Sequence, residues 1–377
     1  MNMKYAGRSV NVGVVGCGYW GPNLVRNIRQ CRDAQLKVIC DASESRLAHM
    51  RRLNPEIPTS REFEELLNDA DLDAVVIATP VRFHYQMAKA ALEAGKHVFI
   101  EKPLARTQAE AAELVHIADR SGLVLMVGHT FLFSPAVRRM KEIIDSGNIG
   151  EVKYIAARRL NLGLFQKDIN VAWDLAPHDL SILLYLLDQF PTSVACQGSC
   201  HIAKGIQDVT MISLTFPNDL CAFVHNSWLD PKKVRHMTVI GSRRMIVYED
   251  TEPLEKLKIY DARVETPPHN DTFADFTYSY HYGDCYMPYV KQDEPLKLEC
   301  QHFVDCIRTG SVPLTNGQLG LDVVRILEAA NESLRRKGAS VPLEPVGCLN
   351  NAHKNGNGHS NGTVERATQV ETGMFIA

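Results

Sequence analysis

The sequence predicts an α/β protein with two domains. The first domain is a doubly wound parallel sheet, and the second is an α/β domain with a large, open, mainly antiparallel sheet. Two observations support this prediction. Up to about residue 129, short apolar runs alternate with amphipathic helical patterns, which is typical of a parallel sheet buried on both faces. Beyond residue 150, longer runs with partial two-residue alternation follow one another across short turns, which is typical of antiparallel strands.

Five short apolar runs, rich in Val, Ile and Leu, are expected to form the parallel sheet. They lie at residues 10–16, 36–41, 72–80, 97–103 and 123–129. The intervening segments carry apolar residues at three- and four-residue spacing, which predicts helices at residues 22–31, 60–70, 85–97 and 107–122. Because strands and helices alternate, the first domain is expected to cover residues 1–128.

A helix over residues 134–150 opens the second domain, which is expected to cover residues 129–345. Its strands are predicted at residues 151–160, 208–216, 220–228 and 236–249, and its closing helices at 296–310 and 317–338. Residues 250–293 have no clean periodicity and are dense in Tyr, Phe and His. They are interpreted as a binding loop or subunit contact, with a packed irregular excursion as the alternative. Residues 346–377 begin with an Asn- and Gly-rich stretch and are expected to form a flexible tail.

The composition favours a small-molecule partner. The 377 residues include 41 basic and 44 acidic side chains, so the net charge of -3 creates no overall field for nucleic acid or an anionic membrane. Ten scattered cysteines contain no CxxC pair, so we expect reduced thiols and no metal site. The first ten residues lack the apolar core of a signal peptide, and no run approaches the ~20 apolar residues of a membrane span. A cytoplasmic protein is therefore expected.

A glycine-rich turn follows the first apolar run. Gly16, Gly18 and Gly21 have the GxGxxG spacing, which by itself is weak evidence for a dinucleotide site. Here a predicted strand precedes the motif, and Pro22 stands where the first turn of a helix begins. In such a turn the first glycine permits a sharp bend, the second lets the backbone approach a pyrophosphate, and the third lets helix and strand pack closely. The helix N-terminus then offers free N–H groups to the phosphates.

An acidic residue at the end of the second strand is the second signal of a dinucleotide site. Asp41 stands there, about 20 residues after the last glycine, where a carboxylate accepts hydrogen bonds from the adenosine ribose. Because a carboxylate repels a 2′-phosphate, NAD is predicted as the cofactor. Arg46 is the opposing signal, since it could hold that phosphate, and NADP is the alternative.

Two further motifs carry candidate chemistry. Glu101 and Lys102, followed by Pro103, lie at the carboxyl end of a predicted strand, where open α/β sheets place ligands. Asp174 and His178 are four residues apart, so they share one face if that stretch is helical. A histidine beside a carboxylate is a candidate general base, and a buried lysine can polarise an oxygen. Taken singly, a lysine at a strand end is more often a solvated charge, and an Asp/His pair at this spacing is more often exposed on a helix surface without a function.

A proline follows closely after Asp174. A helix here would have to hold Pro177 in its first turn, because a proline deeper in a helix breaks it.

The ordered set GCGYWG, CD, ATP, EKP and DLAPHD resembles the glucose-fructose oxidoreductase / inositol dehydrogenase / MocA (Gfo/Idh/MocA) family of pyridine-nucleotide oxidoreductases over residues 10–345. The resemblance implies a Rossmann domain, then an α/β domain with a large open sheet, and an active site between them. It also implies a homodimer or homotetramer formed through that sheet.

The resemblance also implies roles for individual residues. Lys102, Asp174 and His178 would be catalytic, with His178 as the acid/base. The cofactor would be held by Gly16, Gly18, Tyr19, Trp20, Gly21, Asp41, Arg46, Ala78, Thr79, Pro80, His84, Glu101 and Lys102. The sequence GHTFLFSP departs from the Arg or Asn that often follows the fifth strand, which leaves His129 and Phe131 without an assigned role.

Two segments, residues 16–27 and 158–179, are similar to the family branch that acts on nucleotide-linked sugars at C3. This similarity implies an NAD-dependent 3-dehydrogenase acting on a UDP-N-acetylglucosamine-like substrate. The candidate substrate-binding residues are Arg158, Arg159, Asn161, Lys167 and Arg235. An NADPH-dependent dTDP-hexose 3-ketoreductase is the first alternative. A non-catalytic NAD-binding sensor or scaffold is the second, and a catalytic Lys102 with His178 argues against it.

Overall fold

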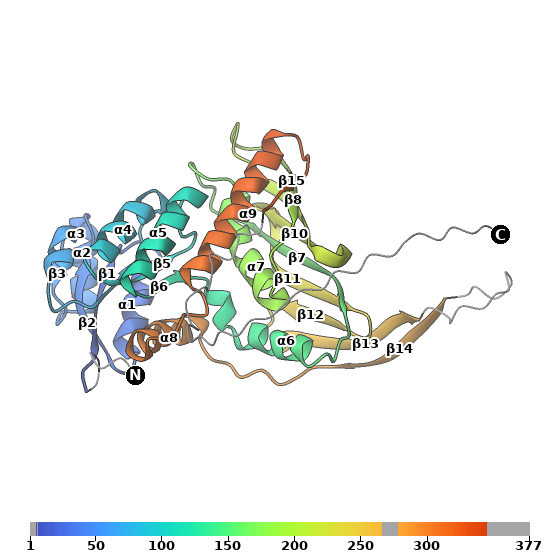
Figure 1. Ribbon diagram of the computed structural model, residues 1–377, viewed down its shortest axis with the longest axis horizontal. Coiled ribbons are helices and arrows are strands. Elements are labelled where there is room, and N and C mark those ends of the chain that lie inside the picture. Colours follow the sequence, from blue (N-terminus) through green and yellow to red (C-terminus); the bar gives the residue numbers. More distant parts are fainter. Residues whose placement is uncertain (1–4, 6, 266–277, 345–377) are drawn as a thin grey trace, which may run out of the picture. The chain divides into compact units, whose positions relative to one another are not determined.

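The computed structural model of the chain describes residue 5 and residues 7–265 and 278–344, which form two sheets joined by helices (Figure 1). The predicted tail, residues 346–377, lies outside the described residues. No helix in the described part is long and apolar enough to span a membrane.

The first sheet has six parallel strands in the order β3-β2-β1-β4-β5-β6. This is the Rossmann order, and it confirms the predicted doubly wound domain. The strands are β1 (Val10–Val15), β2 (Ala34–Cys40), β3 (Thr59–Ser60), β4 (Ala74–Ile77), β5 (His97–Glu101) and β6 (Leu125–Gly128). Every residue of β4, β5 and β6 is buried, as the continuous apolar runs require.

The helices of this domain are α1 (Gly21–Gln30), α2 (Glu44–Leu53), α3 (Phe63–Asn68), α4 (His84–Glu93) and α5 (Gln108–Ser121), with a short 3₁₀ turn, η2 (Val81–Phe83). Of these, α2 was not predicted, because it buries only Leu47 and Met50 and shows little apolar periodicity. Helix α5 has clear end signals. The Thr107 side chain accepts a hydrogen bond from the Glu110 N–H, and Gly122 ends the helix in the left-handed region.

The second sheet has nine strands in the order β14-β13-β12-β11-β7-β10-β9-β8-β15. All its pairs are antiparallel except β7 with β10, which confirms the predicted mainly antiparallel sheet. The strands are β7 (Val152–Leu162), β8 (Ser193–Ser199), β9 (Val209–Thr215), β10 (Cys221–Ser227), β11 (Leu229–Gly241), β12 (Met245–Glu249), β13 (Leu257–Glu265), β14 (Ser279–Tyr286) and β15 (Val341–Pro342).

Helices cover one face of the second sheet. Helix α7 (Val171–Leu187) packs against β7, β9 and β10, and α6 (Pro135–Asp145) packs against α7 (Figure 1). Two 3₁₀ turns complete this part, η3 (Thr130–Phe133) and η4 (Pro217–Asp219). The N-terminal part of α7 therefore lies where the second sheet meets the loop after β6, which contains η3.

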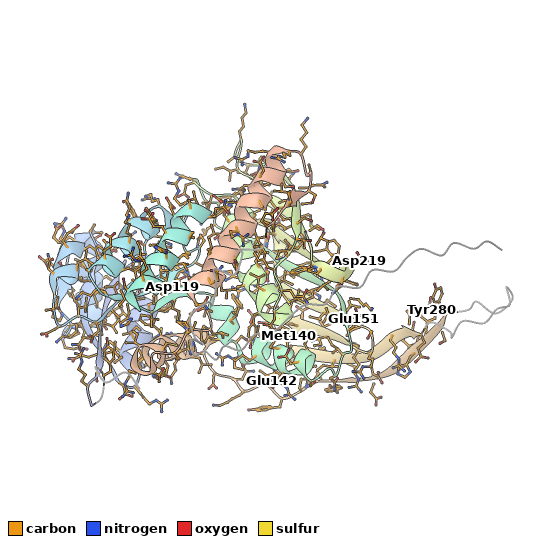
Figure 2. The ribbon with its side chains drawn as sticks, in the orientation of Figure 1. Asp119, Met140, Glu142, Glu151, Asp219 and Tyr280 are labelled. Carbon is orange, nitrogen blue, oxygen red and sulfur yellow. The ribbon has the colours of Figure 1, made fainter. Side chains whose placement is uncertain are left out.

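Residues 250–293, which were interpreted as a binding loop or subunit contact, contain regular strands in the parts that the structure describes, up to residue 265 and from residue 278. This segment contains β13 and β14, which pair as antiparallel strands at one end of the sheet. Nearly all side chains of β14 are exposed, including Tyr280 (Figure 2), so the strand has no buried face. Without a buried face there is no two-residue alternation for a sequence pattern to reveal.

The closing helices connect the two halves. Helix α8 (Pro295–Thr309) packs against α1, and α9 (Gly317–Arg335) packs against α5, α7 and β8. The Arg26 guanidinium on α1 makes two hydrogen bonds, of 2.9 and 2.5 Å, to the carboxylate of Glu294, the residue before α8. These contacts fix the segment before α8 beside the start of α1, where the glycine turn lies.

Candidate active site

The glycine turn has the backbone geometry that its sequence predicts. Gly16 has φ of +95°, and a Cβ at this position would lie 2.6 Å from the carbonyl oxygen of Ala78. A side chain therefore fits neither the conformation nor the space. A Cβ on Gly18 would meet no atom within 4 Å, so the backbone there is open to a ligand. Helix α1 begins at Gly21, which directs its first N–H groups toward this turn.

The Asp41 carboxylate connects the end of β2 to the glycine turn. One oxygen accepts a hydrogen bond from the Cys17 N–H at 2.6 Å, and the other accepts one from the Ser43 N–H at 2.8 Å. The Arg46 guanidinium lies 3.6 Å from the same carboxylate. Each carboxylate oxygen has a second lone pair. Asp41 thus keeps the capacity to accept a ribose hydroxyl while it holds the turn.

The residues predicted to line the cofactor after β4 form a loop that His84 secures. Its ring nitrogens lie 2.8 Å from the carbonyl oxygens of Thr79 and Pro103. Burial lowers the pKa of His84, which is almost fully enclosed. Because both ring nitrogens face these carbonyl oxygens, His84 lies between the loops after β4 and β5 and turns neither nitrogen toward a cofactor. Tyr19 and Trp20, in contrast, are exposed at the glycine turn.

Lys102 is held against the first turn of α7. Its Nζ donates a hydrogen bond of 2.7 Å to the backbone carbonyl of Asp174 and lies 3.9 Å from the Asp174 Oδ1. Burial lowers the pKa of Lys102, and the charges of Asp174 and Glu101 oppose that shift. Burial raises the pKa of the adjacent Glu101 to about 7. The strand end therefore carries a desolvated cation beside a carboxyl group that titrates near neutrality.

Asp174 and His178 do not form the carboxylate–imidazole pair expected from their spacing. The Asp174 Oδ2 accepts a hydrogen bond of 2.9 Å from the Trp228 Nε1, and its Oδ1 faces Lys102. The His178 ring packs edge-on against Phe131, and its Nδ1 is buried without a hydrogen-bond partner among the described residues. Helical spacing placed both residues on α7 but did not determine where the carboxylate points.

The charged groups that most strongly shift the pKa of His178 are positive. Burial holds the pKa of His178 well below its ordinary value, and the charges of Lys102, Arg159 and Arg235 lower it further. The imidazole is therefore neutral at neutral pH, which is the form that accepts a proton.

Pro177 lies deeper in the helix than expected. Helix α7 runs from Val171 to Leu187 without interruption, so Pro177 stands in its second turn. Lacking an N–H, Pro177 leaves the Trp173 carbonyl without its helical donor. The next carbonyl, that of Asp174, is the one that accepts the hydrogen bond from Lys102.

A cavity of about 430 Å³ brings the candidate catalytic groups together. It extends from α1 past the ends of β5 and β6 to α7, β11 and the segment before α8. Its lining includes Trp20, Asn23, Glu101, Lys102, Phe131, His178, Arg235, Asp250, Lys256 and residues 290–296. Two charged groups in this wall, Asp250 and Lys256, were not predicted, because they lie after β12 in the segment that showed no periodicity.

The predicted substrate-binding residues are not brought together. Arg159 is buried and makes two hydrogen bonds, of 2.8 and 2.9 Å, to the Asp179 carboxylate. Arg158 is exposed, because consecutive residues of a strand point to opposite faces of the sheet. Placing both arginines in one site was therefore wrong. Arg235 does line the cavity, where its guanidinium donates to the Asp250 carboxylate at 2.9 Å.

The other two substrate candidates lie apart from this cavity wall. Asn161 is half-buried near the end of β7, next to Gly163, and Lys167 is exposed before α7. Neither residue contributes to the lining of the cavity that holds Lys102 and His178.

Phe131 and His129, which had no assigned role, adjoin the candidate catalytic groups. The Phe131 ring lies 4.5 Å from the Arg159 guanidinium and 5.3 Å from that of Arg235, and it contacts His178. His129 is buried, and burial lowers its pKa to about 3. An aromatic ring between two guanidinium groups holds them by cation–π attraction, so Phe131 orders this wall.

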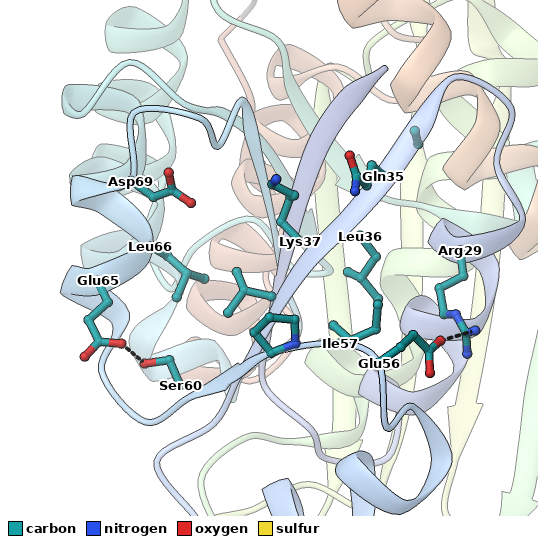
Figure 3. A pocket seen from close by; sticks show the side chains of 13 residues that line it. Arg29, Gln35, Leu36, Lys37, Glu56, Ile57, Ser60, Glu65, Leu66 and Asp69 are labelled. Atoms are coloured by element: carbon teal, nitrogen blue, oxygen red, sulfur yellow. Dashed lines mark hydrogen bonds and ion pairs between the residues drawn. The ribbon is translucent and has the colours of Figure 1, made fainter. Parts of the chain in front are cut away.

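A second cavity, of about 750 Å³, lies away from these groups (Figure 3). It is lined by the first half of β2, the segment around Ile57 and helix α3, and the Arg29–Glu56 ion pair borders it. The glycine turn follows the C-terminal end of β1, which pairs in parallel with β2, whereas this cavity borders the N-terminal half of β2. This cavity contains no candidate catalytic residue, so it is not the active site.

Comparison with known proteins agrees with this geometry. Residues 10–129 match the model of the oxidoreductase family with an NAD-binding Rossmann fold, and residues 137–247 match the GFO/IDH/MocA C-terminal domain. Together the two models cover more than half of the chain. The predicted NAD-binding fold is thus confirmed.

Similar proteins match nearly their whole length. The chain is 26% identical to the uncharacterized oxidoreductase YrbE of Bacillus subtilis, over 87% of this chain and 95% of that protein. It is 25% identical to a myo-inositol 2-dehydrogenase of Thermotoga maritima, over 89% and 99%. Among solved structures, the UDP-N-acetylglucosamine 3-dehydrogenase GnnA of Acidithiobacillus ferrooxidans is 23% identical, with a TM-score of 0.73 over 87% and 99% of the two chains. With both domains matched in order, the chain belongs to the Gfo/Idh/MocA family of NAD-binding oxidoreductases.

Proposed function

We propose that this protein is an NAD-dependent dehydrogenase that oxidises the C3 hydroxyl of a nucleotide-linked sugar, of the UDP-N-acetylglucosamine type, to a ketone. The supporting observation is that Lys102 and His178 line one cavity beside the glycine turn, and that burial and nearby positive charges hold the pKa of His178 well below its ordinary value. An alcohol loses hydride readily only if a base takes its proton and a positive group stabilises the oxygen.

Each catalytic group has a defined task in this proposal. His178 accepts the hydroxyl proton, and the Lys102 ammonium stabilises the negative charge that develops on the oxygen. The Asp174 carbonyl and carboxylate orient that ammonium. The glycine turn, Asp41 and the loop from Ala78 to Pro80 would hold NAD, which supplies the hydride acceptor when bound. Ketone reduction would use the same groups in the reverse direction.

The substrate class rests on the similarity of residues 16–27 and 158–179 to the nucleotide-sugar branch. The structural likeness to GnnA shows the shared fold and adds no evidence about the substrate. A free polyol is the second candidate substrate. Relatives named as inositol dehydrogenases favour it, and one of them is the scyllo-inositol 2-dehydrogenase (NAD(+)) of Bacillus subtilis.

Absorbance at the NADH band separates these candidates. Purified protein with NAD is supplied in parallel with UDP-N-acetylglucosamine, UDP-glucose, myo-inositol and scyllo-inositol. The proposal expects turnover of a UDP-sugar, its loss in Lys102→Ala, and its retention in the exposed control Lys153→Ala. Turnover of inositols alone would replace the nucleotide sugar with a polyol. If the protein oxidises none of these substrates but reduces a 3-keto deoxysugar with NADPH, the ketoreductase replaces the dehydrogenase as the proposed function.

A sensor or scaffold role makes the opposite prediction for two variants. If Lys102→Ala left the biological activity intact while Gly18→Val abolished it, dinucleotide binding rather than catalysis would be the function.

A further inference from the structure

Another cavity of about 430 Å³ lies at the N-terminal end of α7. Its walls come from η2, the start of α5, the N-terminal end of α7, the loop before β9, and α9. Trp173, which lines it, directly precedes Asp174, the residue bound to Lys102. The two cavities therefore share one helical turn.

Two arginines on the Rossmann side give this cavity its charge. Arg82 and Arg106 both line it, and neither forms an ion pair with any described residue. The Arg82 guanidinium stacks over the Phe83 ring at 4.6 Å, which holds the group in place. Asp168 also lines the cavity but pairs with neither arginine among the described residues. Two positive groups and one negative group leave a net positive lining.

A buried donor lies on the opposite wall. Trp173 is 7% exposed, and its indole Nε1 has no hydrogen-bond partner in the described part of the chain. An indole N–H can only donate, so its partner must be an acceptor. The neighbouring Asn170 is already engaged, because its oxygen accepts from the Trp173 backbone N–H and its amide donates to Asn331 at 2.9 Å. Apart from the Asp168 carboxylate, the polar side-chain groups of this lining that lack a partner among the described residues are thus donors.

We propose that this cavity binds the diphosphate of the substrate, an inference that rests on the nucleotide-sugar function proposed above. A diphosphate offers only acceptor oxygens and negative charge, which complements two guanidinium groups that form no ion pair with any described residue. The arginines favoured by the sequence do not fill this role: Arg158 is on the outer face of the sheet, Arg159 is paired with Asp179, and Arg235 with Asp250.

The test is calorimetric titration with inorganic pyrophosphate and with UDP, with the dinucleotide site first saturated with NADH. Saturation matters because the glycine turn also binds pyrophosphate groups. The variants are Arg82→Gln, Arg106→Gln and the double substitution, with Arg120→Gln on exposed α5 as the matched control. Thermal unfolding and the affinity for NADH verify that each variant is folded.

We expect wild type and the Arg120 variant to bind both probes alike. Each single variant should weaken binding at least tenfold, and the double variant should abolish it. Equal binding to the double variant, or no binding to wild type at millimolar probe, would overturn the inference. The result is independent of turnover: if the arginines bind pyrophosphate but only inositols are oxidised, the nucleotide-sugar proposal fails and the anion site stands.

Discussion

The spacing of Asp174 and His178 predicts a carboxylate–imidazole pair, but the His178 ring makes no hydrogen bond to the Asp174 carboxylate. Instead, the nearby charges of Lys102, Arg159 and Arg235 act on His178. The Asp174 carboxylate faces the Lys102 ammonium and accepts a hydrogen bond from the Trp228 indole. In the mechanism proposed above, proton transfer and stabilisation of the oxygen would therefore fall to different groups. The imidazole is kept neutral by burial and by Lys102, and the lysine is kept in place by Asp174.

Replacing His178 with Asn should lower kcat for alcohol oxidation by roughly 10²- to 10⁴-fold, because the proton acceptor is lost. Since the pKa of His178 lies well below its ordinary value, the imidazole remains a base as the pH falls through 6.5. Wild-type kcat/KM should therefore show no loss from His178 protonation between pH 8 and pH 6.5. Steady-state rates across that range test this, with the exposed His116→Asn as control. A decline centred near pH 6.5 would contradict it.

Asp41 should determine the choice between NAD and NADP. The Asp41→Asn substitution removes the charge that repels a 2′-phosphate and leaves one oxygen to accept a backbone hydrogen bond, while Arg46 remains nearby. We expect the ratio of kcat/KM for NADP to that for NAD to rise by about tenfold or more, equivalent to about 1.4 kcal/mol. Glu44→Gln, which neutralises a neighbouring exposed carboxylate, is the matched control. An unchanged ratio would show that Asp41 serves only the turn.

Burial of Glu101 should make stability depend on pH. Its pKa is raised from 4.5 to about 7, so the folded state favours the protonated form. The stabilising contribution is complete below pH 4.5 and is lost as the pH rises through 7. Relative to wild type, Glu101→Gln should therefore gain about 3 kcal/mol of unfolding free energy between pH 4.5 and pH 8. Urea denaturation at both pH values measures the gain, and an equal difference at both would disprove the assigned burial effect.

At the scale of the element, α7 shows how an internal proline is tolerated. Pro177 costs the helix one backbone hydrogen bond, but the flanking turns are anchored by the Asn170 cap and by buried apolar side chains on most of the helix. Tertiary packing thus overrides the local rule that a proline ends a helix.

The Pro177→Ala substitution should stabilise the protein, because it restores an N–H donor to the Trp173 carbonyl and removes the ring's clash. We expect the free energy of unfolding to rise by about 1–3 kcal/mol, measured by urea denaturation. Ala176→Ser, at the neighbouring buried position, is the comparison and should not stabilise. A loss of stability in Pro177→Ala would mean that the proline ring packs into a space that alanine leaves empty.

The buried faces of β9 and β10 made these strands predictable, and β14, which has no buried face, was not predicted. Strands β9 and β10 alternate buried and exposed side chains along most of their length, and both were found from that pattern. Strand β14 exposes its side chains on both faces, so only its hydrogen-bonded pairing with β13 makes it a strand.

At the scale of the whole molecule, the outer face of the nine-stranded sheet carries exposed apolar side chains. Tyr154, Met211, Phe223 and Tyr260 lie on different strands, each with its chain neighbours turned toward the covered face. A contiguous exposed apolar surface on a soluble domain is typical of a subunit interface. We therefore propose a homodimer or homotetramer formed through this face, as the family resemblance implied.

Charges placed on this face should disrupt the assembly. The double substitution Met211→Lys, Phe223→Glu puts charged groups in a surface expected to be buried, so light scattering should report monomers where wild type is oligomeric. Leu53→Glu, at the exposed end of α2, is the matched control and should leave the mass unchanged. A wild-type mass equal to one chain would refute the proposal directly.

The sequence by itself determined the two-domain α/β architecture, the glycine turn with Asp41, and Lys102 at the end of β5. These features depend on local periodicity and on residues close together in the chain, which short-range rules describe. Only the tertiary structure decided which charges meet. It paired Asp174 with Lys102 and Trp228, buried Arg159 against Asp179, turned Arg158 outward, and left Arg82 and Arg106 without an ion-pair partner among the described residues. Partners of long polar side chains are chosen by packing between segments distant in sequence, and no local pattern records that choice.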